Sequence, residues 1–163
     1  MNFSELGLTG TQLRACESLG YTIPTAIQAK AIPIILRGED LIGCAETGTG
    51  KTAAFLLPII QKICERSRPG VRLLVLAPTR ELAMQIDKNY GELNRAKSNR
   101  CITVIGGTNI RTQIADLKRG ATAVIAVVAS AAFNVLELFV AFLQAYIITF
   151  LSALFIGASI HKH

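Results

Sequence analysis

The sequence contains no tryptophan, and its only two histidines, His161 and His163, lie at the very end of the chain. Four cysteines are widely spaced and none forms a Cys-x-x-Cys pair: Cys16, Cys44, Cys64 and Cys101. Zinc sites and disulfide frameworks need closely spaced cysteines or neighbouring histidines. The sequence therefore predicts neither zinc nor a disulfide scaffold.

A secretory signal is also missing, because the first residues lack a basic start followed by an apolar run. We therefore expect a cytoplasmic location. A chain of 163 residues has room for one domain with a hydrophobic core and is too short for two ordinary α/β domains.

Charge is nearly absent from the last part of the chain, where only Glu137 and Lys162 follow Gly120. The net charge of +6 therefore belongs to the front part. A pI near 9.4 suits a phosphate-rich partner such as nucleic acid.

Residues 138–160 form a run of 23 uncharged residues that resembles no other part of the chain. As a helix, at about 1.5 Å per residue, this run would be long enough to cross a hydrocarbon core of about 30 Å. We favour the alternative, which is a truncated or shifted reading frame whose new end is apolar by accident. Both origins predict membrane association, self-association or aggregation, and therefore poor soluble expression.

Apolar runs rich in Val, Ile and Leu predict buried strands at 41–44, 71–76, 102–105 and 124–128. Apolar positions spaced by three or four residues predict helices at 11–19, 25–36, 51–65, 79–89 and 110–117. This alternation indicates an α/β fold with a parallel sheet covered by helices on both faces, and ligands at the carboxyl ends of its strands. Gly38 is expected to close the second helix.

A phosphate-binding loop is predicted between the first strand and the helix that follows it. Its residues fit the pattern Gly-x-x-x-x-Gly-Lys-Thr except at the first position: Ala45, Glu46, Thr47, Gly48, Thr49, Gly50, Lys51 and Thr52. Backbone N–H groups would surround the phosphates, Lys51 would hold the β and γ phosphates, and the Thr52 hydroxyl would bind Mg²⁺. The alternative is a flexible Gly-Thr-Gly turn, which does not require the predicted strand before it and helix after it.

The segment Gly-Tyr-Thr-Ile-Pro-Thr-Ala-Ile-Gln, which ends at Gln28, resembles the glutamine motif of DEAD-box RNA helicases. The resemblance implies a RecA-like domain that binds ATP, with Phe3, Tyr21, Thr25 and Gln28 around the adenine. A carboxamide offers one donor and one acceptor, which complement N6 and N7 of adenine and reject guanine. Phe3 could stack on the base or serve as a core anchor, and Gln28 could instead face solvent.

Two further motifs are similar to segments that contact the RNA backbone in that family. The first follows the strand at 71–76 and includes Pro78, Thr79 and Arg80, and the second is the pair Gly106 and Gly107. A helix N-terminus beside an arginine makes an anion site, and glycines let a phosphate backbone approach closely. The alternative is ordinary helix capping and turn geometry. Such contacts would bind RNA without reading its sequence.

The resemblance covers roughly residues 2–126, so the sequence divides into a partial RecA-like domain at 1–126 and a divergent tail at 127–163. No Asp-Glu-Ala-Asp motif is present, and the only aspartates are Asp40, Asp87 and Asp116. Lys51 and Thr52 are then the only catalytic candidates, and we expect no efficient hydrolysis or unwinding. The leading hypothesis is the incomplete first domain of an ATP-dependent RNA helicase. The alternatives are a non-catalytic adenine-nucleotide and RNA-binding module, which the tail could anchor to a membrane, or an unrelated P-loop enzyme.

Overall fold

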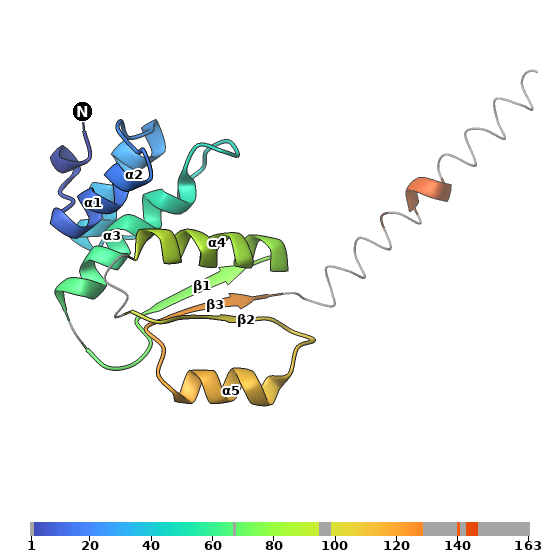
Figure 1. Cartoon of the computed structure of the whole chain (residues 1–163). Coiled ribbons are helices and arrows are strands. Elements are labelled where there is room, and N and C mark those ends of the chain that lie inside the picture. Colours follow the sequence, from blue (N-terminus) through green and yellow to red (C-terminus); the bar gives the residue numbers. More distant parts are fainter. Residues whose placement is uncertain (1, 67, 95–98, 129–139, 141–142, 147–163) are drawn as a thin grey trace, which may run out of the picture. The chain divides into compact units, whose positions relative to one another are not determined.

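The computed structural model describes residues 2–66, 68–94, 99–128, 140 and 143–146. The chain divides into two compact units, Met1–Val128 and Ala129–His163. Figure 1 labels the helices and strands of the first unit.

The first unit begins with short helices and continues with helices and strands in alternation. In chain order its elements are η1 (Ser4–Leu6), α1 (Gly10–Ser18), α2 (Ala26–Arg37), α3 (Lys51–Glu65), β1 (Leu73–Ala77), α4 (Arg80–Leu93), β2 (Cys101–Val104), α5 (Ile110–Lys118) and β3 (Ala123–Val127). All five predicted helices and three of the four predicted strands are confirmed. Gly38 ends α2 with φ 84°, in the left-handed region that favours glycine.

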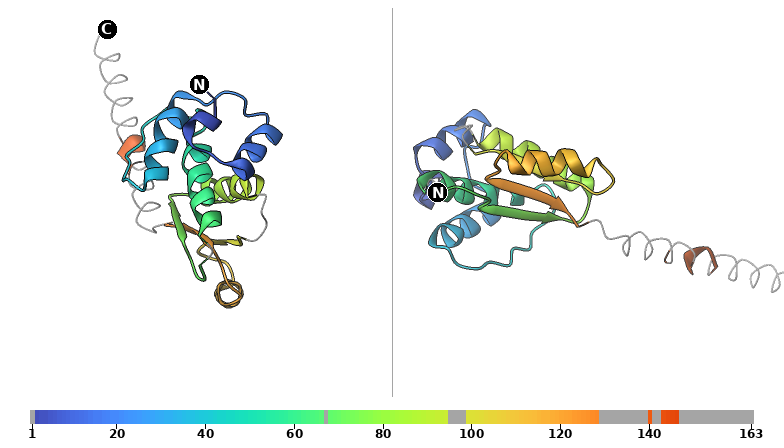
Figure 2. Two further views of the ribbon diagram at one scale, coloured as in Figure 1. Left: turned by 90° about the vertical axis from the view of Figure 1, so that its left-hand side faces the viewer. Right: turned by 90° about the horizontal axis from the view of Figure 1, so that it is seen from below.

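The three strands form a parallel sheet in the order β1-β3-β2 (Figure 2). Leu73 of β1 and Cys101 of β2 both align with Ala123 of β3. Parallel neighbours need helical crossovers, which α4 and α5 provide. The predicted α/β fold with a parallel sheet and flanking helices is therefore confirmed.

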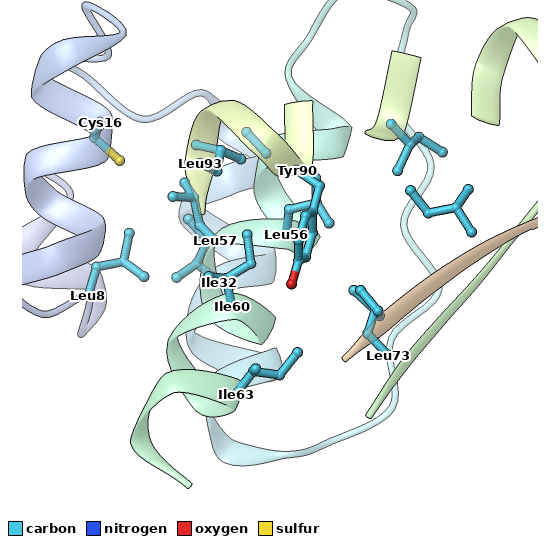
Figure 3. Packing of buried hydrophobic residues seen from close by; sticks show 14 of the residues in the cluster. Leu8, Cys16, Ile32, Leu56, Leu57, Ile60, Ile63, Leu73, Tyr90 and Leu93 are labelled. Atoms are coloured by element: carbon cyan, nitrogen blue, oxygen red, sulfur yellow. The ribbon is translucent and has the colours of Figure 1, made fainter. Parts of the chain in front are cut away.

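The main core lies on the face of the sheet that α3 and α4 cover (Figure 3). Leu56, Leu57 and Ile60 of α3 are fully buried there, together with Tyr90 of α4 and Ile125 of β3. A smaller core on the opposite face joins Ile102, Ala121 and Val124 to α5. Because α3 begins at Lys51, this core fixes the position of the phosphate loop.

The predicted strand at 41–44 is wrong, because these residues are irregular and Ile42 is 94% exposed. Strand conformation is stable only where the backbone N–H and C=O groups pair with a neighbouring strand. In the described part of the chain, 41–44 pairs with no strand. Instead, a cavity of about 510 Å³ separates this segment from apolar residues of α3 and α4 that include Phe55, Leu82 and Ile86.

The expectation that both sheet faces are covered is also wrong at β1, where Leu74 and Leu76 are 61% and 62% exposed. Leu74 aligns with Val124, which packs in the small core beneath α5. Residues in register share a face of the sheet. Helix α5 packs against β2 and β3 on that face, and β1 at the edge is left uncovered.

In the second unit, Val140 and residues 143–146 are helical. No helix among the described residues has the length and apolar character needed to cross a membrane. Most of the predicted span at 138–160 lies outside the described residues. The division at residue 126 stays a prediction, and β3 ends one residue later, at Val127.

Candidate nucleotide and nucleic-acid site

The phosphate loop has the backbone conformation that its glycines predict. Gly48 and Gly50 have φ of 82° and 80°, a region that other residues rarely adopt. Helix α3 begins directly after them, so its first N–H groups and its positive dipole end face the loop. The helix that follows the loop is present as predicted, whereas the strand before it is not.

Polar contacts hold the loop in a compact form. The Lys51 ammonium group donates to the carbonyl oxygens of Ala45 and Glu46, the latter at 2.5 Å. The Thr49 hydroxyl donates to the same Glu46 carbonyl at 2.8 Å. The lysine is therefore folded back over the loop that it would serve.

Helix α2 anchors the loop through two side chains of the glutamine segment. The Thr25 hydroxyl donates to the Thr49 carbonyl at 2.9 Å, and Gln28 Nε2 donates to the Gly50 carbonyl at 3.2 Å. Gln28 Oε1 also accepts from the backbone N–H of Thr25 at 3.0 Å, which completes a capping box. Gln28 is 5% exposed, so the solvent-facing alternative is wrong.

Gly50 is required for this anchoring as well as for its φ. A Cβ atom at Gly50 would overlap Gln28 Nε2 and would lie 3.4 Å from Gln28 Cδ. The Gln28 side chain thus uses the space left by the missing side chain. The glutamine segment and the phosphate loop, 22 residues apart, form one packed unit.

A hollow of about 340 Å³ lies between this unit and α4. Tyr21 and the loop residues Gly48, Lys51 and Thr52 line it. Phe3 is 4% exposed and belongs to the core, where its ring stacks on Tyr21 with centroids 6.5 Å apart. The structure therefore places Phe3 as a core anchor, and Tyr21 is the aromatic ring that reaches the hollow.

Helix α4 lines the other side of the hollow with Gln85, Asn89 and Glu92. They are not among the residues predicted from the sequence. Their spacing by four and three residues places them on one helix face, and this is the signal that could have found them.

The two segments predicted to contact RNA meet in the structure. The Arg80 guanidinium group donates to the Gly106 carbonyl, and a Cβ atom on Gly107 would lie 2.8 Å from Arg80 Nη2. Gly107 has φ 81°. An arginine from the start of α4 and a glycine turn after β2 therefore form one surface at the carboxyl ends of the strands.

Local capping sets the position of Arg80. Pro78 follows β1, and Thr79 caps α4 by accepting from the backbone N–H of Leu82 at 3.2 Å. The glycine turn is held by Gln113 of α5, which bonds both the N–H and the carbonyl of Ile105 at 3.2 Å and 3.0 Å. Gln113 was not predicted from the sequence, because a glutamine within a short amphipathic helix carries no recognisable signal.

Acidic side chains do not gather at the site. Among the described residues, no three His, Cys, Asp or Glu side chains are placed to hold a metal ion. Asp116, which lies in α5, pairs with Arg100 and Arg119 at 3.1 Å and 3.3 Å. The arrangement can bind phosphate groups, but in the part of the chain that the structure describes no carboxylate comes directly after a strand.

Residues 25–147 match the DEAD/DEAH box helicase family. The chain belongs to this family. The match covers most of the chain and extends past residue 126, where the resemblance was expected to end.

Two curated relatives are the ATP-dependent rRNA helicases rrp3 of Neosartorya fischeri and Aspergillus niger. The first is 48% identical over 112 residues, which are 69% of this chain and 24% of the relative. The second is 49% identical over 115 residues, which are 71% of this chain and 24% of the relative. The chain thus spans about a quarter of the length of these helicases.

Solved DEAD-box structures share the fold. A DEAD box protein from Methanococcus jannaschii matches with a TM-score of 0.73 and 38% identity, over 78% of this chain and 34% of that protein. The RNA helicase Prp28 from Chaetomium thermophilum, bound to ADP, matches with a TM-score of 0.69 and 41% identity, over 77% of this chain and 32% of that protein. The RecA-like assignment of the first unit is confirmed.

Proposed function

We propose that this chain binds ATP through its phosphate loop and RNA through the Arg80 surface, as part of the first domain of an ATP-dependent RNA helicase. The single observation that carries the proposal is the packed unit of α2 and the loop. In it Gln28 and Thr25 bond directly to the backbone of Gly50 and Thr49. A merely flexible turn would need no such anchoring.

Phosphate binding requires Lys51 to exchange its two loop carbonyls for phosphate oxygens. The ammonium group has hydrogen-bond partners in both states, so the phosphate oxygens compete with the two carbonyls. The N-terminus of α3 adds backbone N–H donors and a favourable dipole. Thr52 is half-buried at the first turn of α3 and would contribute its hydroxyl to Mg²⁺ that arrives with the nucleotide. Bound there, Mg²⁺ would neutralise phosphate charge.

Adenine selection is assigned to Gln28, with Tyr21 as the ring beside the base. Nε2 and Oε1 of the Gln28 carboxamide each make one hydrogen bond within the protein. One donor hydrogen on Nε2 and one acceptor site on Oε1 remain for adenine N6 and N7. The same residue would therefore join the base to the loop that holds the phosphates.

RNA binding is assigned to Thr79, Arg80 and the glycine pair. Arg80 keeps further N–H donors beyond the one given to Gly106, and a guanidinium fork suits a phosphodiester. Such contacts position a strand without reading its bases.

Efficient ATP hydrolysis is not part of the proposal for these 163 residues. Asp40 lies in the irregular segment before the loop, and Asp87 and Asp116 lie within helices. Among the described residues, no aspartate therefore lines the hollow beside the phosphate loop, where it could orient an attacking water. Unwinding is assigned to the full-length relatives and not to this chain.

The test is binding of a fluorescent ATP analogue to the full chain, with Lys51→Ala as the matched variant. Saturable binding that Lys51→Ala abolishes, and that ATP displaces better than GTP, is the expected result. Equal competition by GTP would remove the role given to Gln28. Circular dichroism of both proteins controls for folding.

A second candidate is a module that binds nucleotide and RNA without turnover, and the missing Asp-Glu-Ala-Asp motif favours it. RNA-stimulated hydrolysis by the purified chain would rule this candidate out.

We assign the activity to the cytoplasm. Flotation with liposomes and light scattering would test membrane association and self-association of residues 127–163.

A further inference from the structure

A second basic surface lies at the amino end of β1, opposite the carboxyl end that the Arg80 surface follows. It consists of two adjoining cavities of about 530 Å³ and about 510 Å³. Lys62 and Arg66 line both, so the two cavities form one basic groove. The basic groove runs from Leu73 of β1 across the ends of α2 and α3 to Leu6 of η1. No step of the proposed function uses it.

Positive charge exceeds negative charge along the basic groove. Its cations come from the ends of α2 and α3 and from the segment before β1: Arg37, Lys62, Arg66, Arg68 and Arg72. Its two carboxylates already have partners, because Arg37 pairs with Glu39 at 2.6 Å and Gln61 donates to Glu65 at 3.0 Å. The carboxyl ends of α2 and α3 each add about half a negative charge, so the five cations leave an excess of about two.

Two of the cations neutralise the helix ends. Lys62 donates to the Ile35 carbonyl of α2 at 3.2 Å. Arg72 donates to the Ile63 carbonyl of α3 at 2.7 Å and also to the Arg66 carbonyl. Ile35 and Ile63 lie among the last four residues of their helices, whose carbonyls lack the usual helical partner. The bond to the Arg66 carbonyl also fixes the backbone that carries Arg66.

Arg66 and Arg68 are the cations left for a ligand. Both are exposed, and among the described residues neither side chain makes a hydrogen bond or an ion pair. A guanidinium group offers N–H donors in a planar fork that fits two oxygens of a phosphate. In the described part of the chain, no aromatic ring lines either cavity, so bases would have no ring to stack on. The basic groove therefore suits the phosphates of a nucleic acid and not its bases.

We propose that the basic groove is a second RNA-binding surface, which holds the phosphate backbone of a single strand through Arg66 and Arg68. Two cavities in a row fit a chain of phosphates better than one compact anion. A nucleic acid carries its charges on the backbone, whereas an acidic peptide must also immobilise flexible side chains. The proposal extends the RNA binding proposed above but uses none of its residues. Contacts to phosphates alone do not depend on base sequence.

The test is a titration of the full chain into labelled single-stranded RNA of about 16 uridines, followed by fluorescence anisotropy at several salt concentrations. In single strands, each neutralised phosphate contributes about 0.7 to the slope of log affinity against log salt. Arg66→Gln combined with Arg68→Gln should therefore weaken binding and reduce the magnitude of that slope by about 1.4. An adenosine oligomer of the same length should show the same loss, because the bases are not read.

The matched variant combines Arg14→Gln with Lys118→Gln. It removes the same two charges from exposed positions of α1 and α5 that line neither cavity. Its slope should equal that of the original chain. If it loses as much as the groove variant, only net charge matters and the proposal is wrong. Matching far-ultraviolet circular dichroism shows that both double variants have folded.

Arg80→Gln separates this surface from the one in the proposed function. In the Arg80→Gln background, the groove variant should still lower the slope by about 1.4. An unchanged slope in the groove variant contradicts the proposal, whatever Arg80→Gln does. Loss in the groove variant with none in Arg80→Gln supports the basic groove and contradicts the Arg80 surface.

A third ligand, polyglutamate, tests the choice of partner. If polyglutamate binding requires Arg66 and Arg68 while RNA binding does not, the basic groove is a protein-docking surface and the proposal is wrong. Absence of saturable RNA binding by the folded chain contradicts both RNA surfaces. ATP binding, which Lys51→Ala tests, is independent of these outcomes.

Discussion

Two glycines of the phosphate loop have the same backbone conformation but different surroundings, and this predicts different costs of substitution. Gly48 and Gly50 have φ of 82° and 80°. A Cβ atom at Gly48 meets nothing within 4 Å, whereas one at Gly50 would overlap the Gln28 side-chain amide. Gly48→Ala therefore reports backbone strain alone, and Gly50→Ala adds the displacement of Gln28.

The magnitudes follow from these contacts. Alanine in the left-handed region costs about 1 kcal/mol at either position. Displacing Gln28 also breaks its bonds to the Gly50 carbonyl and the Thr25 N–H, and each such bond contributes about 1 kcal/mol. We expect Gly48→Ala to lower the free energy of unfolding by about 1 kcal/mol and Gly50→Ala by about 3 kcal/mol.

Urea unfolding followed by circular dichroism, without nucleotide, measures both values. In a Gln28→Ala background, the cost of Gly50→Ala should fall to that of Gly48→Ala, because the obstructing amide is gone. The reasoning is refuted if the two glycine variants are equally stable, or if Gln28→Ala leaves their difference unchanged.

Three other predictions concern the first unit. Thr79→Ala should cost about 1 kcal/mol in urea unfolding by removing the cap on the Leu82 N–H, and Thr79→Ser should restore most of it. Leu57→Ala should cost about 2–5 kcal/mol in the same assay, because Leu57 is fully buried, and a loss below 1 kcal/mol would contradict its place in the core. Burial raises the pKa of Cys101 and of Tyr90 to about 12 each. Because these folded-state pKa values lie above the unfolded ones, the contribution of the two groups to the free energy of unfolding should be intact below about pH 8.5. It should be lost as pH rises toward 12. A flat profile of unfolding midpoint against pH would contradict this.

Local patterns predicted much of the fold because each has a local physical cause. Helix α3 follows the predicted bounds at Lys51 and Glu65, since a left-handed glycine precedes it and its apolar stripe meets the core. The strand expected at 41–44 failed because strand formation depends on a neighbour, which hydrophobicity alone does not supply. The exposure of Leu74 has the same cause, since sequence does not show which strand lies at the edge.

The same distinction between local and tertiary causes applies to the residues of the site. The glycines of the loop and the Thr79 cap were predictable, because their roles follow from their own backbone. The contact between Arg80 and the carbonyl of Gly106 was not predicted, since it joins residues 26 apart through tertiary packing. The two bonds of Gln28 within the protein were likewise not predicted, and they give this residue a structural task besides the proposed adenine contact.

The bonds between Lys51 and its own loop carbonyls have a consequence for the affinity of the site for its ligands. Because the ammonium group is already satisfied, a nucleotide must compete with an internal partner rather than meet a waiting charge. Only the fraction of molecules with the lysine released binds tightly, and the apparent affinity is reduced by that fraction. A ligand whose phosphate chain is too short to reach Lys51 would gain nothing when the lysine leaves the two carbonyls. The folded-back lysine therefore favours ligands with a longer phosphate chain.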